Sequence, residues 1–276
     1  MTRVGFVGDT HGNLLWVQHV LGELNKVGVT TVYQLGDFGL WTGDSGKKFL
    51  RRTNLTLGLF GQTMYVILGN HEHYPRVKFM RTDDDGLLFL KDYPNIKFLP
   101  RGHAWTTENG VRMAALGGAG SIDRALRTED VDWWAEEAIT DEDCAALVAN
   151  VRALGWDHVD VMLTHEAPAG LRRIGFPQLP SWVTPEIEHY TWTQRVLLRD
   201  TLDRVEPLWL LHGHWHQWYR DEYDGENPDN QHEYTCQVIG LNMDGTPRNT
   251  VVATLDPIAG LTDMLVLTNQ TWNTLI

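Results

Sequence analysis

Five short apolar segments, each followed directly by Asp, Asn or His, constrain this 276-residue chain more than any other feature. The segments span residues 4–7, 32–35, 64–68, 159–163 and 208–211, and each contains β-branched or large aliphatic side chains. Short apolar runs bounded by Gly or polar residues are typical of buried β-strands. In an open α/β sheet, ligands bind at the carboxyl ends of the strands, where the loops converge. We therefore expect the polar residues that follow the five runs to form one site.

Helical patterns lie between the early strands. Residues 13–27 place apolar side chains on one helical face, and residues 47–60 carry a weaker pattern of the same kind. Alternation of strands and helices predicts parallel pairing in the first hundred residues. Further along, residues 111–116 predict a strand, and Thr140 begins a helix with a sequence that resembles a capping box.

The second half of the chain is less regular. Residues 168–192 combine Pro, Trp and isolated hydrophobic residues without a period, which predicts a long loop, and residues 194–204 predict a short helix. Long loops inside compact domains are usually functional. Residues 234–239 and 250–255 predict two strands, and the Asn-Met-Asp-Gly sequence at 242–245 predicts a hairpin turn between them.

Length and composition favour one domain over residues 1–276, because the chain lies near the upper size for a single hydrophobic core. No apolar run is long enough to cross a membrane and no signal peptide precedes the first strand, so we expect a cytoplasmic protein without a membrane partner. The only cysteines, Cys144 and Cys236, are too few for a disulfide framework. Cys144 is expected to pack in the core.

The formal net charge of −13 argues against a long nucleic acid as a partner. Nonspecific binding to a phosphate backbone requires clustered Lys and Arg side chains. We expect most of the acidic residues, including the runs at 83–85, 141–143 and 221–233, to be solvated surface.

Seven side chains at the five strand ends are candidate metal ligands. They occur in the motifs GDTHGN, GDFG, GNHE, TH and GHWH, and they are Asp9, His11, Asp37, Asn70, His165, His214 and His216. Carboxylate, amide and imidazole groups without a thiolate suit Mn²⁺, Fe or Zn²⁺. In an extended segment, residues two apart point to the same side, as the Asp-x-His and His-x-His spacings require. The residues therefore predict a site for two metal ions.

These five motifs, in this order over residues 8–216, resemble the signature of the calcineurin-like metallophosphoesterase family. The resemblance implies an α/β (α+β) fold, a four-layer α/β/β/α sandwich of two mixed sheets flanked by helices, with the metal site at the strand carboxyl ends. It also implies two ligand sets, which are Asp9, His11 and His216 for one ion and Asn70, His165 and His214 for the other. Asp37 is implied to bridge both ions.

The resemblance further implies hydrolysis of a phosphoester by in-line attack of a hydroxide that bridges the ions. Metal binding lowers the pKa of water from 15.7 to about 7, which makes hydroxide available at neutral pH. His71 is implied to contact the phosphoryl group together with Asn70 and to protonate the leaving oxygen, so Asp37 and His71 are the expected catalytic residues. Glu72 is expected to orient His71, because a carboxylate partner raises the basicity of imidazole.

The motifs depart from those of the protein serine/threonine phosphatases in the same superfamily. Phe38 follows Asp37 in place of the Arg of an Asp-Arg-Gly motif, and Leu68 precedes Gly69 where those enzymes carry Arg. Without these arginines the means of gripping a phosphoprotein is missing. We therefore favour a phosphodiesterase that acts on small nucleotides, such as cyclic nucleotides, with two Mn²⁺ ions as cofactor.

Aromatic and basic residues near the motifs are candidates for substrate contact. The aromatic residues that could stack on a base are Trp41, Tyr74, Trp182 and Trp215, and the candidates for phosphate contact are Arg76, Arg101, Arg172 and Arg173. The alternatives are a phosphomonoesterase or protein phosphatase, and a metal-binding scaffold without catalysis. The natural substrate, the native metal and the oligomeric state stay open at this point.

Overall fold

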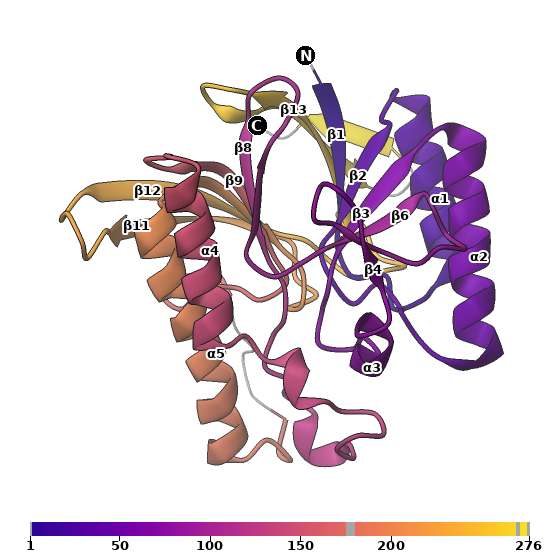
Figure 1. Ribbon diagram of the computed structural model, residues 1–276, viewed down its shortest axis with the longest axis horizontal. Helices are drawn as coiled ribbons and strands as arrows, with labels where there is room; N and C mark the ends of the chain where they lie inside the picture. Colours follow the sequence, from indigo (N-terminus) through magenta and orange to yellow (C-terminus); the bar gives the residue numbers. More distant parts are fainter. Residues whose placement is uncertain (1, 175–179, 269–270, 275–276) are drawn as a thin grey trace.

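The computed structural model describes residues 2–174, 180–268 and 271–274, and its two β-sheets pack face to face (Figure 1). The first sheet has nine strands in the order β15-β14-β13-β1-β2-β3-β6-β5-β4. Its strands are β1 (Thr2–Val7), β2 (Thr31–Gln34), β3 (Thr63–Ile67), β4 (Arg81–Thr82), β5 (Leu88–Phe89), β6 (Ile96–Leu99), β13 (Thr250–Asp256), β14 (Gly260–Thr268) and β15 (Thr271–Thr274).

The second sheet has six strands in the order β11-β12-β10-β9-β8-β7. Its strands are β7 (His103–Thr106), β8 (Arg112–Leu116), β9 (Val159–Thr164), β10 (Pro207–His212), β11 (Tyr219–Glu226) and β12 (Glu233–Gly240). Both sheets are mixed, because a parallel central part carries antiparallel strands at its edges.

Helices cover the outer face of each sheet (Figure 1). They are α1 (Leu14–Lys26), α2 (Gly43–Phe60), the short α3 (Tyr74–Val77), α4 (Asp141–Ala153) and α5 (Pro185–Val205), with 3₁₀ turns η1 (Arg124–Leu126) and η2 (Ala135–Glu137). α1 and α2 lie against the first sheet, and α4 and α5 lie against the second. The chain is therefore the four-layer α/β/β/α sandwich that the family resemblance implied.

Three hydrophobic clusters hold the four layers together. Leu21 of α1 and Leu50 of α2 pack against the first sheet, and Phe6 of β1 packs between the sheets together with Leu163 of β9. Leu198 of α5 packs with residues of the second sheet. All of these side chains are fully buried. Each central strand thus contributes to two interfaces, one per face, because successive side chains of a strand point to opposite faces.

Parallel pairing brings the five predicted strand ends together. β1, β2 and β3 are consecutive parallel neighbours in the first sheet, and β9 and β10 are parallel neighbours in the second. Parallel neighbours end at the same edge of a sheet. The loops that follow all five strands therefore leave the sandwich at one end.

Two sequence predictions in the second half of the chain were wrong. Residues 185–192, predicted as loop, form the first part of α5, which begins at Pro185. The Thr184 side chain caps it by accepting a hydrogen bond from Ile187 N. Such a start is a regular helix signal, but the scattered aromatic residues obscured the helical period. The segment at 242–245 is not a hairpin turn, since β12 and β13 belong to different sheets.

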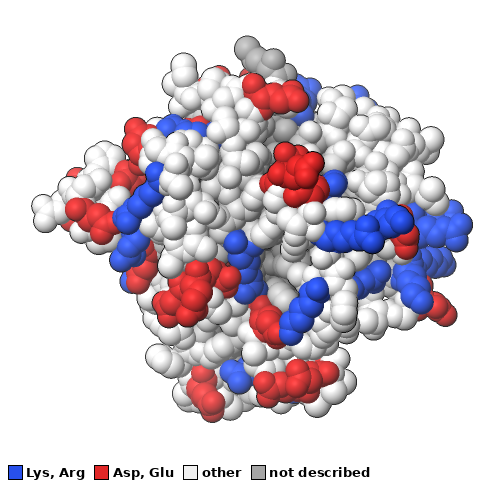
Figure 2. Space-filling view, in the orientation of Figure 1, with Lys and Arg blue, Asp and Glu red and all other residues white. Residues whose placement is uncertain are grey.

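Surface charge is distributed unevenly on the face shown in Figure 2. Acidic side chains are scattered over it, whereas basic ones gather toward α2, which carries the exposed Lys47, Lys48, Arg51 and Arg52. None of the helices in the described ranges combines the length and apolar character that a bilayer span requires.

Candidate metal centre

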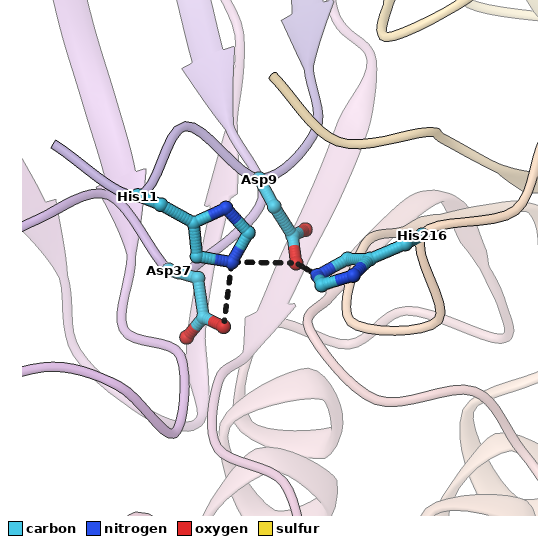
Figure 3. A group of neighbouring side chains, drawn as sticks. All are labelled: Asp9, His11, Asp37 and His216. Atoms are coloured by element: carbon cyan, nitrogen blue, oxygen red, sulfur yellow. Dashed lines mark ion pairs between the residues drawn. The ribbon is translucent and has the colours of Figure 1, made fainter. Parts of the chain in front are cut away.

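Four of the expected ligands lie together where β1, β2 and β10 end (Figure 3). Asp9 and His11 follow β1, Asp37 follows β2 and His216 follows β10. One ligand atom from each side chain lies within 4.8 Å of those of the other three. Ligands at about 2.0–2.2 Å from one ion lie within about 4.4 Å of each other. A small closure would therefore place all four around one cation.

The remaining expected ligands, Asn70, His165 and His214, form a second group, which His165 connects to Asp37 Oδ1. His165 Nε2 lies 2.9 Å from Asn70 Oδ1 and 3.3 Å from Asp37 Oδ1. The ring centroid of His214 lies 5.0 Å from that of His165. Because Asp37 Oδ2 lies 3.6 Å from His11 Nε2, the two carboxylate oxygens face the two groups of ligands. This arrangement suits a carboxylate shared by two cations.

An unpaired buried oxygen supports a cation in the first group. Asp9 Oδ2 is buried and makes no hydrogen bond with the described residues, although His216 Nε2 lies 2.9 Å from it. A buried carboxylate oxygen without a hydrogen bond is costly unless a cation neutralises it. The described residues therefore fit a divalent ion at this position.

The loops that carry these ligands adopt unusual backbone conformations. His11, Asp37, His214 and His216 all have a positive φ, between 41° and 65°. Non-glycine residues rarely adopt this region, and such strain concentrates at functional sites. The carbonyl of Asp37 accepts hydrogen bonds from the amides of Thr10 and His11, at 3.1 and 2.8 Å, and so ties the loop after β1 to the loop after β2.

Glycines leave room for two of the ligand side chains. A Cβ atom at Gly36 would lie 2.2 Å from His165 Nδ1, and one at Gly213 would lie 2.1 Å from Asp9 Oδ1. Any side chain at either position would displace a proposed ligand. These glycines are therefore required by the close approach of neighbouring strand ends.

Two histidines in the centre have a hydrogen-bond partner that orients the ring. His165 Nδ1 lies 2.7 Å from the carbonyl oxygen of Leu35, and His11 Nδ1 lies 2.8 Å from Asp244 Oδ1. His214 makes a longer contact, since its Nε2 lies 3.6 Å from Glu166 Oε2, which is buried and has no hydrogen-bond partner among the described residues. A carboxylate or carbonyl that is hydrogen-bonded to a metal-binding histidine fixes its tautomer and raises its basicity.

Sequence reasoning missed Asp244 and Glu166. Asp244 lies between β12 and β13 and also accepts a hydrogen bond at 2.7 Å from Asn13, the residue that caps α1. In the same connection, Asn249 donates to the carbonyl oxygen of Asp9 at 3.1 Å. Asp244 was concealed by the assignment of its segment to a hairpin turn. Glu166 follows His165 directly, and this adjacency was the one available signal.

The carboxylates change the protonation of the histidines. Burial alone lowers the pKa of His11, but Asp37 and Asp9 outweigh this and raise it to about 10. Burial also lowers the pKa of His165, but the negative charge of Asp37 outweighs burial and raises this pKa to about 9. Burial and the neighbouring His165 hold the pKa of His214 well below its usual value. A divalent cation would supply the positive charge that the carboxylates otherwise draw from His11 and His165.

His71 lies at the edge of the centre. The prediction that the Glu72 carboxylate orients His71 was wrong. Its amide donates to Asp37 Oδ1 at 2.9 Å, and its Nε2 lies 3.9 Å from Asp123 Oδ2. The Glu72 carboxylate instead accepts from the backbone amides of Phe38, Gly39 and Leu40, at 2.5, 3.3 and 2.7 Å. Glu72 therefore holds the loop that follows Asp37, and burial raises its pKa to about 7.

A buried polar network orients Asn70. Asn70 Nδ2 donates to Ser121 Oγ at 2.9 Å, and Ser121 Oγ donates to Glu137 Oε2 at 2.6 Å. Arg127 completes the network with an ion pair to Glu137 at 2.5 Å. With its amide nitrogen engaged, Asn70 presents Oδ1 to His165. No local sequence pattern indicates this network, since its members lie in an irregular segment between β8 and α4.

Two cavities adjoin the centre, and their described linings share no residue. A cavity of about 520 Å³, here called the α5 cavity, is lined by His214, Trp215, Glu166 and residues of α5. A second cavity of about 470 Å³, here called the His71 cavity, is lined by His11, His71, Trp41, Asp123 and Arg127 among others.

Some of the aromatic and basic residues that the sequence suggested for substrate contact line these cavities, and others have structural roles. Trp215 lines the α5 cavity and Trp41 lines the His71 cavity. Tyr74 is buried and donates to the Gly69 carbonyl at 2.8 Å, while Arg101 donates to backbone carbonyls at 136–138. Trp182, Arg76, Arg172 and Arg173 line neither cavity within the described residues. Trp192 and Arg195, which line the α5 cavity, were not predicted.

Comparisons with known proteins concern the fold and the family of the chain. The structure resembles a dimetal phosphatase from Danio rerio, with a TM-score of 0.58, 14% identity and coverage of 99% of this chain and 98% of that one. It also resembles the protein TT1561 of Thermus thermophilus, with a TM-score of 0.54, 11% identity and coverage of 99% and 97%. At these identities the likeness concerns the fold. A comparison with curated proteins gives no match. The model of the calcineurin-like phosphoesterase family matches residues 2–218, and the chain belongs to that family.

Proposed function

We propose that this protein is a phosphodiesterase with two divalent metal ions and that small nucleotides are its substrates. The observation that carries the proposal is the pair of cavities beside the candidate metal centre. A phosphodiester has two organic substituents on one phosphorus atom, whereas a monoester has one. Two separately lined cavities beside one centre offer a place for each substituent of a diester.

The seven candidate ligands are proposed to hold the ions as the family resemblance implied. Asp9, His11 and His216 would hold one ion, Asn70, His165 and His214 would hold the other, and Asp37 would be shared by both. This proposal is supported by the two oxygens of Asp37, each of which faces one group of ligands. The dimetal phosphatase from Danio rerio, which has the same fold, gives it further support.

Bound divalent ions would activate water at neutral pH and neutralise charge on the phosphoryl group. Mn²⁺ is the proposed ion, because the donors are carboxylate, amide and imidazole groups without a thiolate. His71 protonates the leaving oxygen, and Asn70 and His71 contact the phosphoryl group. Asp123 lines the same cavity as His71, and its Oδ2 lies 3.9 Å from His71 Nε2.

Small substrates are proposed in place of long nucleic acid because of charge. The net charge is −13, and the exposed basic residues of α2 line neither cavity in the described part of the chain. A protein that cleaves long nucleic acid needs basic residues that hold the phosphate backbone at its site. Among the Lys and Arg residues in the described part of the chain, Arg127 lines the His71 cavity and Arg195 lines the α5 cavity.

Hydrolysis of bis(p-nitrophenyl) phosphate with added Mn²⁺ and with EDTA tests the proposal. We expect turnover with Mn²⁺ and none with EDTA, and faster turnover of the diester than of p-nitrophenyl phosphate. A faster monoester reaction would favour the phosphomonoesterase alternative. Full occupancy by metal without turnover of either ester would favour a metal-binding scaffold.

The role of His71 is tested by a change of leaving group. His71→Gln should keep both ions, because neither ligand set includes it. General acid catalysis contributes about 10²–10⁴-fold, but p-nitrophenolate leaves without a proton and a ribose alkoxide does not. The rate loss should therefore be much larger for a dinucleotide than for bis(p-nitrophenyl) phosphate. His103→Gln, on β7, is the control. Equal losses on both substrates would point to phosphate binding alone.

A further inference from the structure

The α5 cavity has the features of a binding site for a flat, uncharged ring. Its walls include Trp192 and Trp215 together with Ile122 and Pro185. Trp192 is 47% exposed although it is a large apolar side chain. A volume of about 520 Å³ lies within the range of small-molecule sites.

Arg195 joins the two tryptophans into one wall. Its guanidinium carbon lies 4.9 Å from the ring centroid of Trp215 and 5.5 Å from that of Trp192. Its nitrogens donate to the backbone carbonyls of Ala167, at 3.4 Å, and Pro168, at 3.1 Å. These contacts anchor the guanidinium and hold the indole rings in place, since cation–π contacts of this kind are attractive.

The charges of the cavity disfavour a second anionic group on the ligand. Among the described residues, the carboxylates of Glu166 and Glu188 line it against one guanidinium, that of Arg195. Glu166 Oε2 is buried and has no hydrogen-bond partner in the described part of the chain. A ligand that carries hydrogen-bond donors on an aromatic ring matches these walls, and a further phosphate does not. Nucleobases have this chemistry, with a flat face and amino or imino donors.

The position of the cavity indicates which part of a diester it receives. His71, the proposed proton donor to the leaving oxygen, lines the other cavity, whereas His214 lines the α5 cavity. The leaving group therefore lies on the His71 side, and the α5 cavity faces the substituent that stays on the phosphate.

We propose that the α5 cavity binds the base of the nucleoside that remains esterified to the phosphate after hydrolysis, with the base stacked on Trp192. The products are then a nucleoside monophosphate, whose base lies in the cavity, and a free alcohol. This inference rests on the proposed phosphodiesterase function and adds the identity of the retained group.

Two diesters with one leaving group provide the test. Adenosine 5′-(p-nitrophenyl phosphate) and methyl p-nitrophenyl phosphate both release p-nitrophenolate and differ only in the retained group. In Trp192→Ala, kcat/KM for the adenosine ester should fall by about 5- to 150-fold, the loss expected for one base–aromatic stack. The value for the methyl ester should change less than about twofold, since it cannot use the stack.

Matched variants separate stacking from a general defect. Trp192→Phe should restore most of the preference, because Phe keeps an aromatic face. Trp182→Ala removes a tryptophan that is 39% exposed and does not line the cavity, and it should behave as wild type. Binding gives a readout without turnover, because wild type should bind adenosine monophosphate more tightly than ribose 5-phosphate by calorimetry. This difference should disappear in Trp192→Ala.

Different failures have different meanings. Equal losses on the two esters, or no loss on either, would overturn the assignment of the cavity while the phosphodiesterase function stands. Absence of turnover of both esters by wild type loaded with Mn²⁺ would overturn the proposed function and the inference that depends on it.

Discussion

Asp244 is predicted to control the affinity of the ion held by Asp9, His11 and His216. Its Oδ1 lies 2.8 Å from His11 Nδ1, and this contact leaves Nε2 of the ring facing the other ligands. Replacement by Asn keeps an acceptor of the same shape but removes the negative charge. Replacement by Ala removes both, and also frees Asn13.

The size of the effect follows from the exposure of the pair. Loss of an outer partner of a metal-binding histidine costs about 10- to 100-fold in affinity. The side chains of His11 and Asp244 are 26% and 18% exposed, so solvent screens part of their interaction. We therefore expect about a 10-fold loss in Asp244→Asn, about 1.4 kcal/mol, and up to about 100-fold in Asp244→Ala.

Titration of the metal-free protein with Mn²⁺ by calorimetry measures this effect. One of the two binding events should weaken, and the one that uses Asn70, His165 and His214 should keep its affinity. Asp157→Asn is the control, because Asp157 also contacts a histidine, His158 at 2.9 Å, outside the metal centre. Unchanged affinity of both sites in Asp244→Ala would refute this role of Asp244.

Two further predictions concern stability. Glu72→Ala should lower the free energy of unfolding, measured by urea titration, by about 3 kcal/mol or more. The substitution leaves three buried amides at residues 38–40 without an acceptor, which costs about 1–3 kcal/mol for each amide and is partly relieved by water. A change below about 1 kcal/mol would contradict this. In the metal-free protein, the pKa of His11 is raised to about 10 and that of His165 to about 9. The protonated histidines therefore stabilise the fold fully below about pH 6.5, and this stabilisation is lost as the pH rises through 9 to 10. Stability of the metal-free protein should therefore fall between pH 7 and 10 and should fall less in His11→Gln, and equal slopes would contradict it.

The sequence was sufficient to predict the parts of the fold and site that depend on local patterns. The strand ends at Asp9, Asp37 and Asn70 follow apolar runs whose type and length are readable one at a time. Their convergence then follows from parallel pairing, which the alternation of strands and helices implies. The family resemblance supplied the grouping of the ligands into two sets.

Features that depend on distant contacts were not predictable in the same way. The Asp-Gly pair at 244–245 is a turn signal, but the strands on either side of it pair with β10 and β1 in different sheets. Glu72 was expected beside His71 because they are adjacent in sequence, whereas its buried carboxylate turns to the amides of residues 38–40. Trp192 was assigned to a loop, and only the packing of α5 shows that it lines a cavity beside His214.

Metal analysis of the protein at full activity tests the central claim most directly. The number of ions per chain would be measured by mass spectrometry in wild type and in Asp37→Ala, alongside hydrolysis of bis(p-nitrophenyl) phosphate. Because Asp37 is proposed to be shared, we predict two ions per chain in fully active wild type and loss of both metal occupancy and activity in Asp37→Ala. One ion per chain at full activity, or two tightly bound ions in Asp37→Ala, would contradict a centre bridged by Asp37.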